Sequence, residues 1–270
     1  MEKKVRNKRL AVLVVLEILI LVGVFLTGGH NASEESIREV MKDAVLHETA
    51  KVNLPGGLVV NPGVISAFTV TGILFVFALI VRIFVIPHFK TVPGKFQMLL
   101  ENAVGLFDGL AKGNSPHRNR FLGGYIFTAG VYIFTSTLFE LLGLQAVTTA
   151  GGSIALPAPL SDINAAIALG CLSYGIILGG GILSNGFHGF VATLKEFSLP
   201  ISMSFRLFGA LLSGALVTEL VYYYMSLSFV LPVIVGVLFT LMHALIQAYV
   251  LTMLTSVYYG EVSEPAHEKE

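Results

Sequence analysis

Residues 200–217 read Pro200-Ile-Ser-Met-Ser-Phe-Arg-Leu-Phe-Gly-Ala-Leu-Leu-Ser-Gly-Ala-Leu-Val217, an apolar stretch long enough to enter a bilayer. It contains one charged side chain, that of Arg206. A guanidinium cannot lose its proton at physiological pH, and holding it at mid-membrane costs at least about 2.5–3.5 kcal/mol. The protein must therefore supply Arg206 with water, a cavity or an anionic partner, so this arginine is a candidate functional residue.

The composition of the whole chain predicts an all-α, polytopic membrane protein. Of its 270 residues, 54% are hydrophobic and 13% are charged, and the mean hydropathy is +0.80. Soluble domains carry about 25% charged residues, so a large soluble protein with an unusually apolar core is the weaker interpretation. The net charge is zero, which argues against a nucleic-acid partner because phosphate binding needs a basic surface.

Six apolar stretches approach or exceed the roughly 20 residues that a helix needs to cross a bilayer. They are Leu10–Thr27, Ile65–Ile86, Phe121–Leu144, Ile163–Leu183, Ile201–Tyr224 and Phe229–Tyr259. The last stretch is too long for one upright crossing, so we expect it to tilt or to project into water. We therefore expect about six membrane-embedded helices, the last two of them long, tilted and forming a hairpin.

The distribution of Lys and Arg predicts which side of the membrane each connection faces. Basic residues gather before the first stretch and in segment 88–120, whereas the loop 145–162 contains neither Lys nor Arg. Lys195 and the charged tail from Glu261 then fall on the same side as the N-terminus. We expect six crossings with both termini in the cytoplasm.

The remaining segments divide the chain into three parts. Residues 1–64 combine an N-terminal anchor with an external amphipathic segment, Glu34–Lys51; residues 65–262 form the membrane domain, and 263–270 a cytoplasmic tail. Met1–Thr27 also fits an export signal, but Glu17 interrupts the apolar run and favours a retained anchor.

Pro93–Lys112 is expected to form a helix along the cytoplasmic face. Its apolar residues recur at helical spacing, at Phe96, Leu99, Leu100, Val104 and Phe107.

Other polar side chains interrupt the apolar stretches or stand at their ends. They are Glu140, Asp162, Asn164, Glu219, His243 and Gln247. Ser202 shares a helix face with Arg206, and His243 shares one with Gln247, because each pair is four residues apart. Glu219 follows Arg206 by thirteen residues, about 20 Å along a helix, so it cannot pair with that arginine within one straight helix. A counter-charge must come from elsewhere, for example from another subunit.

Each of these residues also has a simpler interpretation. His243 and Gln247 could hydrogen-bond neighbouring helices, Glu140 could reach headgroup water, and Arg206 could form a structural ion pair with an internal carboxylate. The chain carries no phosphate-binding glycine loop, zinc motif or nucleophile elbow. We therefore expect no cofactor and no catalytic activity of its own; any nucleotide chemistry takes place on another polypeptide.

Four motifs together resemble subunit a of the F-type rotary ATP synthase, and they occur in that family's order over roughly residues 65–262. They are Phe89-Lys-Thr-Val-Pro-Gly-Lys-Phe-Gln97, Ser161-Asp-Ile-Asn-Ala-Ala-Ile-Ala-Leu169, Ser198-Leu-Pro-Ile-Ser-Met-Ser-Phe-Arg-Leu-Phe-Gly209 and Gln247-Ala-Tyr-Val-Leu-Thr-Met-Leu-Thr-Ser-Val-Tyr258.

The resemblance implies roles for the matching residues. Arg206 would be the stator arginine that faces the carboxylates of a rotating ring of small hairpin subunits (subunit c), and Gln247 would lie beside it. Glu196 and Ser202 match polar positions toward the cytoplasmic exit. Glu140 takes the place of an Asp or Asn that lines the outer inlet, and Asn164 follows the family's Asp-Leu-Asn pattern.

The same resemblance implies two offset half-channels for H⁺ or Na⁺, coupled to ATP synthesis or hydrolysis. It implies a place in the lipid bilayer of a bacterial plasma membrane, and a peripheral stalk subunit b among the partners.

Three positions depart from the family pattern. Ala210 replaces an Asn, Ala215 replaces an acid or His, and Thr240 replaces a Glu or His. Glu219 and His243 stand nearby instead and are included with the ion pathway. Two alternatives remain open: a self-contained secondary transporter in which Arg206 binds an anionic solute, and a membrane scaffold in which Arg206 pairs with Glu140 or Glu219.

Overall fold

The structure is a computed structural model that describes residues 52–53, 59–147, 153–223 and 231–265, together with the isolated positions 22 and 38. Almost all of the first apolar stretch, Leu10–Thr27, and of the segment Glu34–Lys51 lies outside these ranges. The division of the chain at residues 64 and 262 stays a prediction.

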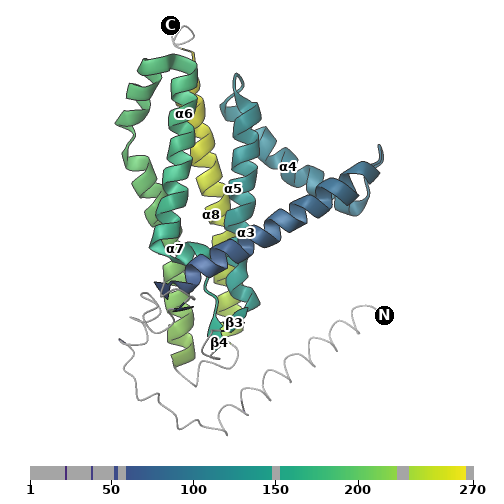
Figure 1. Cartoon of the computed structure of the whole chain (residues 1–270), viewed down its shortest axis with the longest axis vertical. Helices are drawn as coiled ribbons and strands as arrows, with labels where there is room; N and C mark the ends of the chain where they lie inside the picture. Colours follow the sequence, from purple (N-terminus) through teal and green to yellow (C-terminus); the bar gives the residue numbers. More distant parts are fainter. Residues whose placement is uncertain are drawn as a thin grey trace.

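The described chain folds into long helices joined by short elements (Figure 1). The helices are α3 (Pro62–Ile80), α4 (Lys95–Asn114), α5 (Asn119–Phe139), α6 (Ile163–Lys195), α7 (Ser198–Tyr223) and α8 (Leu231–Ser263). A π-helix η1 (Val81–Val85) and a 3₁₀ turn η2 (Ile86–His88) extend α3, η3 (Glu140–Leu142) ends α5, and η4 (Pro159–Ser161) precedes α6. Two antiparallel pairs, β1 (Val52–Asn53) with β2 (Val59–Val60) and β3 (Gln145–Val147) with β4 (Ser153–Ala155), lie in the connections. The predicted all-α class is confirmed.

Five helices in the described ranges are long and apolar enough to cross a membrane. They cover Pro62–His88, Asn119–Leu142, Ile163–Lys195, Ser198–Val217 and Gly236–Ser263. Their burial pattern fits lipid as the solvent, because small polar side chains such as Ser136 and Ser173 are fully buried while Phe68 and Phe187 are exposed. Polar and small residues mediate helix contacts in membranes. Five of the six predicted crossings are thus confirmed as membrane-compatible helices.

Two helix N-termini are tied together at one end of the bundle. The Asn61 side chain accepts the backbone N–H of Gly63 at 3.0 Å and so caps α3, and Asp162 accepts that of Asn164 at 2.8 Å and so caps α6. Asn61 Nδ2 also donates to Asp162 Oδ2 at 2.7 Å. Side-chain caps satisfy N–H groups that the helix leaves without partners, and here one carboxylate joins two helices.

Helix α6 reverses direction at Gly186, which has φ 56° and ψ −134°. Glycine adopts positive φ without steric penalty, and the two legs then touch backbone to backbone at Gly181 and Gly189. The sequence predicts a helix end at Leu183, but the second leg runs on to Lys195 beside the first. Lys195 therefore lies on this returning leg, not in the turn itself.

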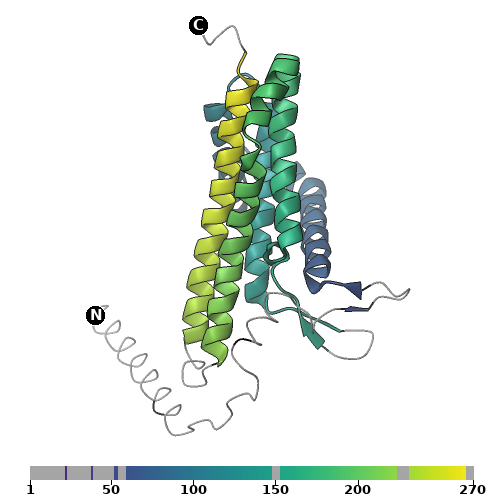
Figure 2. The same ribbon diagram turned by 90° about the vertical axis from the view of Figure 1, so that its left-hand side faces the viewer.

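Helix α8 forms the centre of the bundle, where it packs against α5, α6 and α7. Figure 2 shows α7 and α8 side by side as a long pair, the predicted hairpin. The predicted helix at Pro93–Lys112 is also confirmed, with observed bounds Lys95–Asn114. In Figure 1, the far half of α3 and the beginning of α4 extend away from the bundle, whereas the C-terminal half of α4 packs on α5 and α8.

The contact between Gly180 of α6 and the ring of Tyr259 of α8 gives a stability prediction. A methyl group at Gly180 would overlap the tyrosine ring, whereas one at Gly179 would meet nothing within 4 Å. Gly180→Ala should therefore lower the unfolding free energy by about 1–3 kcal/mol, as overpacking does. Gly179→Ala should leave it unchanged or raise it slightly. Thermal unfolding in mild detergent measures both, and equal effects would contradict the close packing of α6 on α8.

Candidate functional site

Arg206 lies on the outward face of α7. That helix turns Met203, Leu207 and Leu211 into the core, whereas Arg206 lies off this buried stripe and is exposed. Ser202, Gly209 and Ser213 share the exposed side, and a methyl group added at Gly209 would meet nothing within 4 Å. Small side chains thus leave open space around the arginine.

No carboxylate among the described side chains forms an ion pair with Arg206. An ion pair that the structure does contain joins Lys112 and Asp108 at 2.6 Å, on α4. The side chain of Glu219 lies outside the described atoms, but its place on α7 is about 20 Å along the helix from Arg206. The charge of Arg206, on a membrane-spanning helix, must therefore be solvated by water or paired with a negative group outside the described chain.

Gln247 brings a second unmatched polar group to the neighbouring helix, α8. Its side chain is 6% exposed, and Oε1 accepts no hydrogen bond within the described chain. Leaving a buried acceptor unsatisfied costs about 1–3 kcal/mol. The flanking residues Ala248 and Leu251 share one core cluster with Met203 and Leu207 of α7, so the two helices that carry Arg206 and Gln247 are in direct contact.

His243 lies one helical turn before Gln247. Its Nδ1 lies 2.8 Å from the carbonyl oxygen of Phe239, and its ring lies against the Phe239 ring with centroids 5.9 Å apart. A carbonyl can only accept, so Nδ1 carries the hydrogen, and Nε2 is the ring nitrogen at which a proton can be gained or lost. This is the tautomer that a proton relay through Nε2 requires.

The other predicted site residues fall into two groups. Glu196 directly follows the last residue of α6, and its backbone N–H donates to the carbonyl of Thr193 at 3.0 Å. Ser202 lies six residues further on, near the start of α7. Glu140 opens η3, whose Leu141 lies against Gly236 of α8.

Asn164, in the first turn of α6, is exposed. Its neighbour Asp162, which the sequence also places at this end, is occupied in capping α6 and bonding Asn61.

A clamp on the C-terminal end of α8 was not foreseen from the sequence. Ser184 Oγ donates to the carbonyl of Ser263, and Asn185 Nδ2 donates to the carbonyls of Val262 at 3.0 Å and Glu264 at 2.8 Å. These are carbonyls that a helix end leaves without partners. The only sequence signal was Ser-Asn-Gly at 184–186, a turn-forming triplet inside an apolar run.

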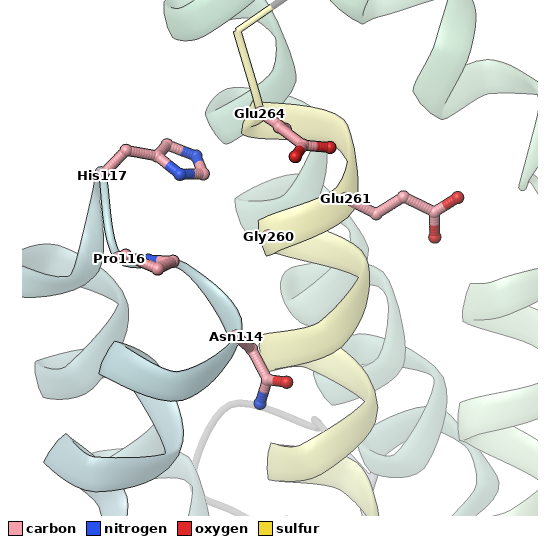
Figure 3. A pocket seen from close by; sticks show the side chains of 6 residues that line it. All are labelled: Asn114, Pro116, His117, Gly260, Glu261 and Glu264. Atoms are coloured by element: carbon pink, nitrogen blue, oxygen red, sulfur yellow. The ribbon is translucent and has the colours of Figure 1, made fainter. Parts of the chain in front are cut away.

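The α4–α5 turn holds α8 from the other side. His117 Nε2 lies 2.9 Å from Ser263 Oγ, and Asn114 Nδ2 lies 3.2 Å from Ser256 Oγ. Figure 3 shows the pocket of about 550 Å³ between this turn and α8. It is lined by Asn114, Pro116, His117, Gly260, Glu261 and Glu264. Arg206 and Gln247 do not line it, so it is not a solute cavity around the arginine.

Comparison with known proteins gives a consistent result. A family model described as "ATP synthase A chain" matches residues 64–260. Similar proteins include the ATP synthase subunit a of Cereibacter sphaeroides, 25% identical over 188 residues that cover 65% of this chain and 72% of the relative. The subunit a of Haemophilus ducreyi is 29% identical over 201 residues, covering 62% and 76%. That of Histophilus somni is 28% identical over 204 residues, covering 62% and 76%.

The clamp predicts a stability effect at Asn185. Asn185→Ala removes two hydrogen bonds to α8 and should lower the unfolding free energy by about 2 kcal/mol, since each contributes about 1 kcal/mol. Asn119→Ala is the matched control, because the described bond of that side chain is local, to the Pro116 carbonyl at 3.1 Å. Thermal unfolding in detergent compares the two variants; a larger loss for Asn119→Ala would speak against the clamp.

Proposed function

The chain belongs to the ATP synthase A chain family, and from that premise we propose that it is the stator ion-channel subunit of a rotary ATP synthase. It provides two offset half-channels that carry protons to and from the carboxylates of a rotating ring. The ring consists of small hairpin subunits, and a peripheral stalk subunit holds the stator in place. Ion flow through the half-channels is thereby coupled to ATP synthesis or hydrolysis on other subunits.

The exposure of Arg206 without a described counter-ion is the observation that carries this proposal. A cation in this position needs an anionic partner from outside the chain. Ser202, Gly209 and Ser213 on the same side allow another helix to approach closely. A ring carboxylate that passes this face in turn meets both requirements, a negative charge and a close backbone.

The charge on Arg206 then directs proton transfer. A ring carboxylate crosses lipid at low cost only when neutral, because burying its charge is expensive. Beside Arg206 the pKa of that carboxyl falls, since an adjacent cation favours the charged form. The arriving carboxyl releases its proton toward the inner half-channel, and a proton from the outer half-channel neutralises it before it re-enters lipid. The fixed positive charge also repels a proton that would pass directly between the half-channels.

Polar residues on either side of Arg206 serve as the two pathways. Glu196 and Ser202 precede the arginine in the chain and line the inner exit. Glu140, Asn164, Glu219, His243 and Gln247 form the outer route. The Lys and Arg distribution places the end of the bundle with Gly186 and Ser263 in the cytoplasm, so the end with Asn61 and Asp162 faces outward. Within the described chain the pocket of Figure 3 lies away from Arg206, and no observation favours a secondary transporter.

Replacement of the arginine tests the proposal directly. Arg206→Ala should reduce proton-driven ATP synthesis in membrane vesicles to background, because no charge remains to discharge the ring carboxylate. Assembly should persist, since the side chain is exposed and makes no contact with a described carboxylate. Phe205→Ala is the matched control: it truncates the adjacent exposed side chain and leaves the charge. Normal coupled synthesis by Arg206→Ala would refute the assignment.

The outer route predicts a separate effect at His243. His243→Phe keeps an aromatic ring against Phe239 but removes Nε2, so the rate of synthesis should fall several-fold while the complex stays assembled. General acid–base groups typically raise a reaction rate by about 10²–10⁴-fold. We expect a smaller loss here, because Glu140 remains in the outer route and can still carry protons. Measuring the rate against external pH identifies the step, since added external protons should partly restore it. An unchanged rate at every pH would remove His243 from the pathway.

A further inference from the structure

The corner between α3 and α4 concentrates positive charge at the rim of the membrane domain. We call residues 81–97 the basic corner; it contains Arg82, His88, Lys90 and Lys95, all exposed. The sequence has no Asp or Glu from residue 49 to residue 100, so no acid within the corner itself offsets its three permanent charges. Elsewhere on α4, in contrast, Lys112 is paired with Asp108 at 2.6 Å.

The side chain of Gln97, in the first turn of α4, holds the backbone of the corner in place through hydrogen bonds to Lys90. Its Oε1 accepts the backbone N–H of Lys90 at 3.1 Å, and its Nε2 donates to the carbonyl of Lys90 at 2.9 Å. The same Nε2 donates to Glu101 Oε1 at 2.7 Å, so one carboxylate adjoins a corner that carries three cations and the local excess of charge stays positive. The side chains of Lys90 and Lys95 therefore project from one fixed turn, just beyond the π-helix that carries Arg82.

Large apolar side chains surround these cations. Ile83, Phe84, Val92 and Phe96 are all strongly exposed, and Figure 1 shows that the corner stands clear of the bundle. A ligand that fits must therefore combine an apolar body with a compact negative head. An anionic phospholipid has both, since acyl chains cover the apolar side chains while the phosphate meets the cations.

We propose that the basic corner is a binding site for anionic phospholipid headgroups, with Arg82, Lys90 and Lys95 as the phosphate-binding residues. Basic side chains next to a membrane attract anionic lipid by up to about fivefold in affinity for each residue. The preference should weaken as salt is added, because exposed charges are screened. The site is independent of Arg206 and of the proposed ion pathway.

The chain contains no tryptophan, so a single introduced one reports on its own surroundings. Phe84→Trp places the probe in the corner, where Phe84 is 66% exposed, and Phe68→Trp places it near the other end of the same helix, where Phe68 is 76% exposed. The full chain is reconstituted in phosphatidylcholine vesicles that contain either brominated phosphatidylglycerol or brominated phosphatidylcholine. Fluorescence quenching by the two bromolipids gives their relative affinity at each position.

We expect phosphatidylglycerol to be favoured at least fivefold at Phe84→Trp and not at Phe68→Trp. Adding Arg82→Gln, Lys90→Gln and Lys95→Gln should abolish the preference, whereas Lys112→Gln should leave it unchanged because that lysine is already paired. Quenching of Phe68→Trp in the same triple variant checks that the chain is still folded in the bilayer.

Three results would each overturn the proposal. The first is an equal preference at both probe positions, and the second is a preference that survives the triple substitution. The third is an absence of quenching by either lipid at Phe84→Trp, which would show that lipid does not contact the corner.

Discussion

A guanidinium in a membrane helix must be matched by a negative charge or by water, and the contacts of this bundle leave that requirement to be met from outside. Helix α7 buries one stripe against α6 and α8, and Arg206 stands off that stripe. Close packing at Gly170, whose missing side chain makes room for Pro200 and Ser204, holds the helix from behind. The described chain therefore fixes where the charge points without neutralising it.

At both ends of the helix bundle, side-chain hydrogen bonds to helix termini hold neighbouring helices together. At one end Asn61 and Asp162 cap and join α3 and α6, and at the other Asn185 clamps α8. Between them lie a donor and an acceptor without described partners, Arg206 and Gln247 Oε1, on two helices in contact. A buried acceptor and an exposed cation on adjoining helices, both without described partners, suit a site whose partner comes from outside the described chain.

Five of the crossings could be predicted, because apolar length is a property of local sequence. The side of the membrane that each connection faces stays a prediction. The helix α4 could be predicted from its apolar spacing, whereas the roles of Arg206 and Gln247, taken from the motif resemblance, stay predictions. The reversal at Gly186 could not be predicted, since the glycines of that run look alike until tertiary contacts select one for positive φ. The clamp and the structural use of Asp162 depend on residues about 80 and 100 positions apart. Local sequence carries no signal for such long-range pairs. The first crossing, the domain division and the role of Glu219 in the ion pathway stay predictions.

In the proposed outer half-channel, Glu219 and His243 cannot reproduce the family arrangement by one common shift along their helices. Glu219 stands four residues beyond the family's acid position, which moves it about 6 Å along α7 away from Arg206. His243 stands three residues beyond the corresponding position on α8, which moves it about 4.5 Å toward Gln247. Because α7 and α8 run antiparallel, the two displacements are opposed and the pair is drawn apart. The proposed route then needs a third polar group between these two, and we propose Glu140 for it, because its turn packs on α8 at Gly236.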